Sequence, residues 1–381
     1  MKPTEKPSDN SLRLGAAGDV ALGGVLEGVD PVPLAAEVRS FFAESDLNFV
    51  DLDCTLDSKG RPPNPQEYLV AASPRQLDLL TQLQIHLVSQ ANNHSIDYGG
   101  SSLAATQAHL QAAGIGWVGA GADLESARRP LILERQGLRV GFLGYASTHP
   151  WVGALPAGEG RPGVAPLEPE LMRADIQALS RQVDCVVVSV HWGKEFIPYP
   201  PPQNVQLGHC LIDWGARLVL GHHPHIIQGI EGYRDGIICY SLGNFLFPDY
   251  PDQGLAFEGT GRESLLVRFR ITRAGAALEQ VVPVCLAPEG RLARLRGGRE
   301  EAVHLALLGY SAALRQPEYR AFWQGQVRRA EVRRLWRVFG QEVVQAGWRR
   351  GAARLLRLGR KNFQSVGRSL REILLGTGRQ V

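Results

Sequence analysis

The sequence predicts an α/β layered fold, in which strands form sheets and helices flank them. Over residues 12 to 290, short apolar runs alternate with stretches of helical length and periodicity. Such alternation is typical of parallel strands joined by helical crossovers. Glycines and prolines stand where these segments end. The 381-residue chain is long enough for one large domain and an extension.

The predicted elements follow one another regularly along the chain. The predicted strands span residues 12–17, 47–52, 85–90, 117–119, 131–134, 139–145, 185–191, 218–221 and 236–241, and the predicted helices span residues 74–83, 101–113, 169–182 and 204–214. Ser73 and Pro74 supply an N-cap and a first helical residue, and Gly114 suits a left-handed C-cap. The prolines within residues 197–202 exclude a helix interior, so an ordered loop is expected after His191.

Charge divides the chain near residue 290. Residues 291–381 carry 20 Lys and Arg against 6 Asp and Glu, a net charge of +14, whereas residues 1–290 carry −11. We therefore predict a flexible N-terminus over 1–11, an α/β domain over 12–290 and an Arg-rich, mainly helical extension over 291–381. Within the extension, Leu335, Trp336, Val338 and Phe339 have amphipathic spacing.

The extension has three possible partners. A basic segment beside an acidic domain is expected to dock on that domain, and peripheral contact with an anionic membrane is the second choice. Nucleic acid is the least favoured, because no binding motif is present. The polar amino terminus lacks the apolar region of a signal peptide, and no apolar run reaches the roughly 18–20 residues of a membrane span. A cytoplasmic protein, with membrane association only through the extension, is expected.

Polar side chains collect where the predicted strands end. They are Asp19, Asp51, Asp53, Asn93, His94, His191, His222, His223, His225 and Asn244. In α/β folds, loops at the carboxyl ends of strands converge on one edge of a sheet. A lone histidine there is more often a core residue, but this combined set of oxygen and imidazole groups suits one or two divalent cations, such as Mn, Fe, Zn or Mg.

The segment His223-Pro224-His225 is the most specific part of this set. In an extended segment, residues two apart point to the same side, so His223 and His225 are expected to bind one centre while His222 points away. His222 is therefore assigned a supporting or substrate-binding role. Proline between the two histidines restricts the backbone, which reduces the entropy that ligand binding costs.

The amide of Asn93 suits a site that already has enough anionic ligands. Two metals that share a bridging carboxylate would fit such a site and would activate a water for attack on a phosphoryl or carbonyl centre. His94, beside Asn93, is then available as a general acid or as a group that polarises the substrate.

Seven short motifs give the chain its resemblance to a known family. They are Gly18-Asp19-Val20, the run from Ala91 to Gly99, Gly119-Ala120-Gly121, the run from Gly141 to Tyr145, His191-Trp192-Gly193-Lys194-Glu195, Gly221-His222-His223-Pro224-His225 and the run from Tyr240 to Phe245. In this order they resemble the CapA branch of the calcineurin-like metallophosphoesterases, which is linked to poly-γ-glutamate capsule synthesis. The resemblance covers about residues 12 to 285.

The resemblance implies which residues bind metal. Carried over position by position, it assigns Asp19, Asn93, His191, His223 and His225 to metal, with His94 near the substrate. Asp53 stands where the family has the Glu of Asn-Leu-Glu, and we assign it to metal as well. The Asp-x-His opening of ordinary metallophosphoesterases is absent, because Val20 and Ala21 follow Asp19. One imidazole ligand is therefore missing, which leaves open one metal or two.

Four further residues are assigned to substrate binding, to catalysis or to support of the ligands. Lys194 could hold a carboxylate or phosphate, and Glu195 could act as a general base, although an exposed salt-bridging pair is an equally good interpretation. Asp97 is expected to orient His94. Asn244 either donates a hydrogen bond into the cleft or caps a turn.

Three functional hypotheses follow. The first is a metal-dependent hydrolase that acts on a phosphoester or a γ-glutamyl amide and takes an anionic polymer or phosphoester as substrate. The second is a non-catalytic, metal-binding subunit of a capsule polymer assembly or export complex. The third is a cytoplasmic phosphodiesterase unrelated to capsule.

Overall fold

The computed structural model describes residues 10–60, 62–63 and 68–346, with only the backbone for residues 334–346. The chain forms two compact units, of which the first ends at Arg315 and the second begins at Gln316. The described part of the second unit contains a long helix, α9 (Tyr319–Ala346). The amphipathic positions predicted at residues 335–339 fall where only backbone is described, and residues 347–381 of the predicted extension lie outside the described residues.

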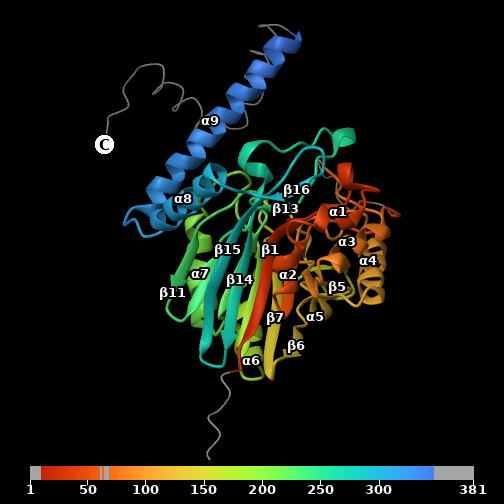
Figure 1. Ribbon diagram of the computed structural model, residues 1–381, viewed down its shortest axis with the longest axis vertical. Helices are drawn as coiled ribbons and strands as arrows, with labels where there is room; N and C mark the ends of the chain where they lie inside the picture. The colour runs from red at the N-terminus through yellow and green to blue at the C-terminus, as the bar shows by residue number, and fades with distance from the viewer. Residues whose placement is uncertain (1–9, 61, 64–67, 347–381) are drawn as a thin grey trace, which may run out of the picture. The chain divides into compact units, whose positions relative to one another are not determined.

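The larger sheet of the first unit has eight strands, and both parallel and antiparallel pairs occur in it (Figure 1). Its order is β16-β15-β14-β1-β2-β3-β4, with β13 also paired to β1. The bounds are β1 (Leu12–Val20), β2 (Leu47–Leu52), β3 (Leu87–Ser89), β4 (Gly116–Val118), β13 (Asn244–Leu246), β14 (Glu263–Thr272), β15 (Gly275–Leu286) and β16 (Leu292–Arg294). Strands β1 to β4 are parallel, whereas β14, β15 and β16 are antiparallel neighbours beside β1.

The second sheet has six strands in the order β11-β12-β10-β9-β7-β6. Its bounds are β6 (Leu131–Arg135), β7 (Leu138–Ala146), β9 (Cys185–His191), β10 (Leu218–His222), β11 (Ile230–Tyr233) and β12 (Gly236–Cys239). The four central strands are parallel and both edge strands are antiparallel. A two-stranded sheet is formed by β5 (Ala120–Gly121) and β8 (Gly163–Val164).

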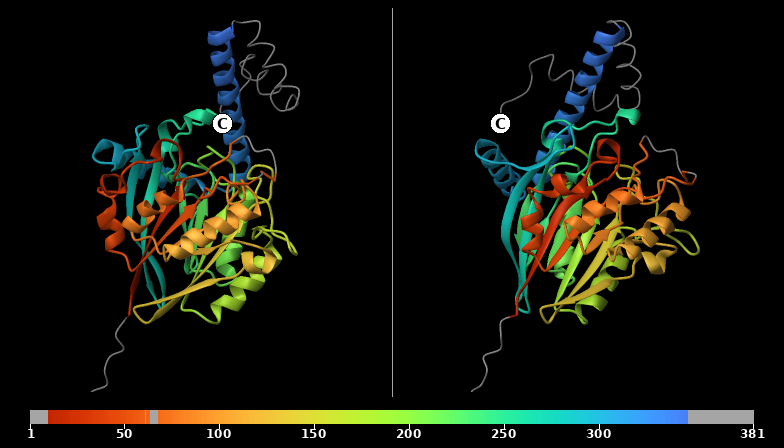
Figure 2. Two further views of the ribbon diagram at one scale, coloured as in Figure 1. Left: turned by 90° about the vertical axis from the view of Figure 1, so that its right-hand side faces the viewer. Right: turned by 45° about the vertical axis from the view of Figure 1, so that its right-hand side comes forward.

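Helices flank the two sheets (Figure 2). One group packs on the outer face of the larger sheet: α1 (Pro31–Ala35), α2 (Arg39–Ala43), α3 (Leu77–Gln82) and α4 (Gly100–Ala112). Two helices, α6 (Pro169–Ser180) and α7 (Pro202–Asp213), pack on the second sheet, and α5 (Leu124–Ala127) packs on β5 and β8. Short 3-10 turns occupy Gly24–Leu26, Pro74–Gln76, Pro251–Gln253 and Gly259–Arg262. No described helix combines the length and apolar character that crossing a membrane requires.

The two sheets share a core between their inner faces. Alternate residues of β2 and β9, such as Leu47, Phe49, Cys185 and Val187, enter this core. Because the side-chain period of a strand is two, Asp51 and His191 lie on the same inward faces, closer to the strand ends. The apolar alternation that builds the core therefore also points the polar strand-end residues inward.

Helix α8 (Gly298–Ala313) completes one edge of this shared core. Its residues Val303 and Leu307 join the core cluster, and the Ser311 hydroxyl accepts a hydrogen bond of 2.9 Å from the amide of Ile230 in β11. The first compact unit therefore includes this helix.

The predicted α/β layered fold is confirmed, and antiparallel pairs flank the predicted parallel strands. Strands β5, β8, β11 and β13 to β16 were not predicted, and β14 shows why. Arg268 interrupts its apolar run, yet this side chain is only 5% exposed. Its guanidinium donates to the Phe41 carbonyl, the Glu44 carboxylate and the Gln280 amide oxygen at 2.7 to 3.1 Å. These tertiary contacts allow a charged residue to occupy a buried strand position.

Close packing of β1 against the turn before β13 gives a first prediction. A Cβ at Gly18 would collide with the Gly243 carbonyl oxygen, which accepts the Asp19 amide at 2.9 Å. We expect Gly18→Ala to destabilise the fold by about 1–3 kcal/mol, through overpacking. In α8, Gly309→Ala meets no atom within 4 Å and should stabilise by about 0.5–1 kcal/mol. Urea unfolding midpoints measure both, and equal midpoints for Gly18→Ala and wild type would contradict the prediction.

Candidate metal centre

Most of the predicted site residues lie at or just after the carboxyl ends of central strands from both sheets, whereas Asn244 is the first residue of β13. In the larger sheet, strand register pairs Asp19 of β1 with Asp51 of β2 and with Asn244 of β13. In the second sheet it pairs His191 of β9 with His222 of β10. All five of these residues are fully buried. Strand pairing thus collects residues that are as much as 225 positions apart, from Asp19 to Asn244, at one end of the sandwich.

Asp19 accepts several hydrogen bonds from the histidine segment. One of its oxygens is 2.9 Å from His222 Nδ1, and the other is 3.1 Å from the His223 amide and 3.2 Å from His225 Nδ1. Burial opposes ionisation, yet the hydrogen bonds to His222 and His225 hold the pKa of Asp19 well below its usual range. Asp19 is therefore an anion that fixes the position of this segment.

His222 does not point away from the histidine pair, as the extended arrangement had predicted. It is the last residue of β10 and faces Asp19. The backbone turns sharply after it, with φ of 90° at His223 and 56° at His225, so the segment is not extended. This turn brings all three histidines close to Asp19. The alternation of side chains along an extended strand does not predict that arrangement, because the backbone here is not extended.

Asp53 is the least satisfied polar residue of the cluster. Its side chain is fully buried, and neither carboxylate oxygen has a hydrogen-bond partner. Burial raises the pKa of Asp53 to about 6, while neighbouring His191 and His94 act against that rise. A buried carboxylate without donors is costly unless a cation compensates it.

Asp51 belongs to the same cluster, although the sequence did not single it out as a ligand. One oxygen lies 3.0 Å from His191 Nδ1, and the other has no hydrogen-bond partner. Burial raises the pKa of Asp51 to about 7, against the opposing influence of His222 and of nearby Ser89 and Asn92. The available signal was the Asp-x-Asp spacing with Asp53, because residues two apart in a strand share a face.

Asn93 and His191 contact each other across the two sheets. His191 Nε2 lies 2.8 Å from Asn93 Oδ1, while its Nδ1 faces Asp51. Burial lowers the pKa of His191 to about 4, so the ring is neutral and has a single N–H for two acceptors. A cation beside this ring would resolve the mismatch, as would donation by the amide of Asn93.

The rings of His223 and His225 differ in their surroundings. His223 Nε2 lies 3.0 Å from the Trp151 carbonyl oxygen, and its Nδ1 is buried without a partner. Burial lowers the pKa of His223 to about 3, so this ring is neutral. His225 Nδ1 lies 2.9 Å from Asn244 Oδ1, and the Asn244 amide donates to the Gly261 carbonyl. Asn244 therefore holds His225 in place.

His94 and Asp97 form a buried pair beside the cluster. His94 Nδ1 lies 2.8 Å from Asp97 Oδ2, which also accepts the Val70 amide at 2.7 Å. Although burial acts against it, the carboxylate of Asp97 raises the pKa of His94 to about 8. His94 thus holds a proton at neutral pH.

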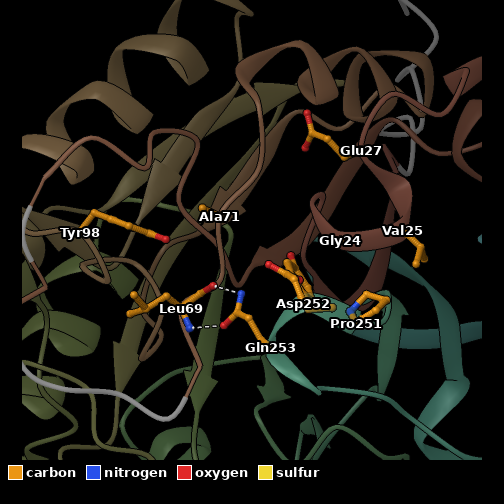
Figure 3. A pocket seen from close by; sticks show the side chains of 10 residues that line it. Gly24, Val25, Glu27, Leu69, Ala71, Tyr98, Pro251, Asp252 and Gln253 are labelled. Carbon is orange, nitrogen blue, oxygen red and sulfur yellow. Dashed lines mark hydrogen bonds between the residues drawn. The ribbon is translucent and has the colours of Figure 1, made fainter.

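A cavity of about 560 Å³ lies next to this pair and contains none of the predicted site residues (Figure 3). Tyr98, which follows Asp97, forms part of its wall, as do Leu69 and Ala71 on either side of Val70. The Gln253 side chain bonds both backbone groups of Leu69, at 2.8 and 2.9 Å. The wall of the cavity and the His94–Asp97 pair are therefore held by the same backbone segment.

Lys194 and Glu195 follow the cluster on the loop after β9. Lys194 Nζ lies 5.5 Å from the centre of the Trp151 ring, within the range of a cation–π contact. Glu195 is exposed, and its carboxylate belongs to a group of possible ligands with His223 and His225. The loop therefore places one cation and one anion beside the buried histidines.

Four groups of three described residues could hold a metal ion, with candidate ligand atoms within 4.8 Å of one another. They are Asp19-Asp53-His225, Asp51-Asp53-His191, Asp19-Asp51-His222 and Glu195-His223-His225. The unpaired atoms of Asp53, Asp51 and His223 make this donor set fit a divalent cation. Asp53, like Asp19, Asp51 and His225, belongs to two of these groups, and both of its oxygens would be available to a cation.

The pKa of Asp53 predicts how metal affinity depends on pH. The carboxylate must be ionised to bind a cation, and burial holds its pKa near 6. We expect the affinity for Mn²⁺ to be at least about tenfold weaker at about pH 5 than at about pH 7.5, because protons compete below that pKa. Titration calorimetry measures the change, and circular dichroism confirms that the protein stays folded. Equal affinity at both values would contradict the assignment of Asp53.

Comparison with known proteins agrees with the motifs. The family model described as "Bacterial capsule synthesis protein PGA_cap" matches residues 13–249. The PGA biosynthesis protein CapA of Bacillus subtilis is 28% identical over 283 residues, 73% of this chain and 72% of that protein. The capsule biosynthesis protein CapA of Bacillus anthracis is 28% identical over 297 residues, 74% of this chain and 70% of that protein.

A solved calcineurin-like phosphoesterase from Bacillus subtilis is also similar, with 11% identity and a TM-score of 0.41 over 80% of this chain and 100% of that chain. The match to the family model extends from β1 past the histidine segment to the end of β13 and so includes every strand end that contributes to the cluster. This chain therefore belongs to the PGA_cap family of bacterial capsule synthesis proteins.

Proposed function

We propose that the chain is a metal-dependent hydrolase that cleaves phosphoester or γ-glutamyl amide bonds in the metabolism of an anionic capsule polymer. The observation that carries this proposal is the buried Asp53 carboxylate, which has no hydrogen-bond donor and shares two ligand groups with Asp19, Asp51, His191 and His225. A divalent cation bound there would supply Lewis acidity toward a phosphoryl or carbonyl oxygen.

The protein groups around the centre suit hydrolysis. His94 carries a proton at neutral pH because Asp97 raises its pKa, so it can protonate a leaving group. The bond between Nδ1 and Asp97 leaves Nε2 as the nitrogen for that transfer. His191 and His223 stay neutral and so keep lone pairs for a cation.

One residue on the loop after β9 suits an anionic substrate. Lys194 offers a positive charge outside the buried cluster, and a lysine binds phosphate or carboxylate as a point charge. Relatives in Bacillus are described as PGA biosynthesis or capsule biosynthesis proteins. A polymer of glutamate offers both a dense row of carboxylates and an amide link, which are the two features that this site would need.

A second candidate function is a metal-binding subunit of polymer assembly without turnover of its own. A Mycobacterium tuberculosis relative, 32% identical over 60% of each chain, is described as a probable polyglutamine synthesis accessory protein. The absence of a histidine two positions after Asp19 favours this alternative, because an incomplete ligand set weakens the two-metal hydrolysis that the resemblance implies.

One experiment on His223 distinguishes the two functions. We expect purified wild-type protein to hold divalent metal and to hydrolyse a member of a panel of phosphodiesters and γ-glutamyl peptides. His223→Ala should lower metal content and reduce turnover by about 100-fold, because it removes a buried nitrogen that has no other partner. Mass spectrometry of bound metal and initial rates measure both quantities.

The matched control is His209→Ala, since His209 lies on α7, half-buried, and pairs with Glu231 rather than with the cluster. It should leave metal content and turnover unchanged. Metal bound without turnover on any substrate would favour the assembly function. A wild-type protein without metal after incubation with divalent cations would exclude the hydrolase and the ligand assignments together.

A further inference from the structure

We propose that Glu195 is a metal ligand, the exposed member of a set with His223 and His225, and that it is the ligand which an incoming anionic substrate displaces. The inference rests on the metal centre of the proposed function and gives Glu195 a role different from that of a general base. Three features support it: the groups that surround His223, the fixed ring of His225, and the backbone that carries Glu195.

The ring of His223 is prepared to bind a cation through one particular atom. Nε2 faces a carbonyl oxygen, that of Trp151, at 3.0 Å, and a carbonyl can only accept. Nε2 therefore carries the hydrogen of this ring, and Nδ1 carries the lone pair. Nδ1 has no partner, and His223 is 1% exposed. A backbone carbonyl that fixes the tautomer of a histidine in this way is a recurrent feature of metal sites.

The ring of His225 is also fixed on one side. Its Nδ1 lies 2.9 Å from Asn244 Oδ1 and 3.2 Å from Asp19 Oδ2. Both contacts use Nδ1. Nε2 is therefore the nitrogen of His225 that would bind a cation. The ring centres of His223 and His225 are 5.7 Å apart, so the two rings can address one position between them.

Phe196, the residue after Glu195, is held in an unfavourable backbone conformation. Phe196 has a φ of 56°, a region that bulky side chains rarely adopt, and its amide donates to the Pro224 carbonyl at 2.9 Å. Pro224 lies between the two histidines. This hydrogen bond therefore attaches the Glu195 loop directly to the His223-Pro224-His225 segment, and strain of this kind is common at ligand sites.

The Glu195 carboxylate is within reach of both rings. A Glu195 oxygen and one nitrogen from each histidine lie within 4.8 Å of one another. Such a spacing needs only a small movement of a flexible, exposed side chain to surround a cation at about 2.0–2.2 Å. The carboxylate also supplies a ligand to a centre whose first strand provides only Asp19, since Val20 and Ala21 have no ligating side chain.

Exposure distinguishes Glu195 from the other ligands. Both histidines of this set are buried, whereas Glu195 is exposed to solvent. A ligand on the solvent side can leave without breaking the packing of the core. A phosphate or carboxylate of the substrate, attracted by Lys194 on the same loop, could then take its place on the cation.

Metal binding by Glu195→Gln tests the inference, because this change removes the charge and preserves the shape. With Co²⁺ and Mn²⁺ as probes, we expect at least about tenfold weaker binding of one metal equivalent, and a changed visible absorption spectrum of the Co²⁺ protein. Titration calorimetry and absorption spectroscopy measure these changes without any substrate. Glu159→Gln, the same change at an exposed loop position outside the four ligand groups, should match wild type in both.

The outcomes separate this inference from the proposed function. Wild-type affinity and an unchanged Co²⁺ spectrum in Glu195→Gln would overturn the ligand role, and loss of turnover alone would then identify Glu195 as a base. In that case the metal centre and the hydrolase proposal would stand. If wild-type protein itself binds neither probe metal, both proposals fail together. Circular dichroism of each variant confirms that exposed substitutions have left the fold intact.

Discussion

The structure depends on the burial of carboxylates at the point where two sheets meet. Asp53 is fully buried with both oxygens unpaired, and Asp51 beside it has one oxygen unpaired. In a low-dielectric interior, such groups destabilise a fold unless positive charge or donors compensate them. In the described part of the chain, the ligand groups that contain these two carboxylates are completed by histidines and by Asp19. That choice leaves room for a divalent cation, which is the compensation that this donor set fits.

Each histidine of the cluster is oriented by a specific acceptor. Asp19 accepts from His222 and His225, Asp51 faces His191, and the Trp151 carbonyl fixes His223. These acceptors come from strands or loops of different parts of the chain, so the positions of the rings depend on the packing of both sheets. A shift of one residue in the pairing of β9 with β10 would turn His191 or His222 out of the core. The site and the fold are therefore stabilised by the same register.

Strained backbone occurs in the segments that carry these rings. Positive φ angles at His223, His225 and Phe196 occur within contact distance of the cluster. Hydrogen bonds from the His223 amide to Asp19 and from the Phe196 amide to Pro224 hold this backbone in place. The strain is offset by the packing around it, in which Phe247, Phe257 and Phe196 surround His225. The loop that follows β9 carries Lys194 and the exposed Glu195 on the solvent side of this buried centre.

The sequence alone determined the layered α/β class, most of the parallel strands and the strand ends at which the polar residues stand, because periodicity and turn residues are local properties. Through the family resemblance it also named six candidate metal ligands, whereas Asp51 and Glu195 joined the candidate ligand groups only in the structure. Only the tertiary structure decided the antiparallel pairs, the orientation of His222 and the place of Asp51 in the cluster. The antiparallel β14–β15 pair depends on contacts of buried Arg268 with distant residues, and His222 faces Asp19 because the backbone turns at His223. Asp51 joined the cluster only through pairing of β1 with β2 and the approach of the second sheet, since the environment of a carboxylate is set by residues far away in sequence.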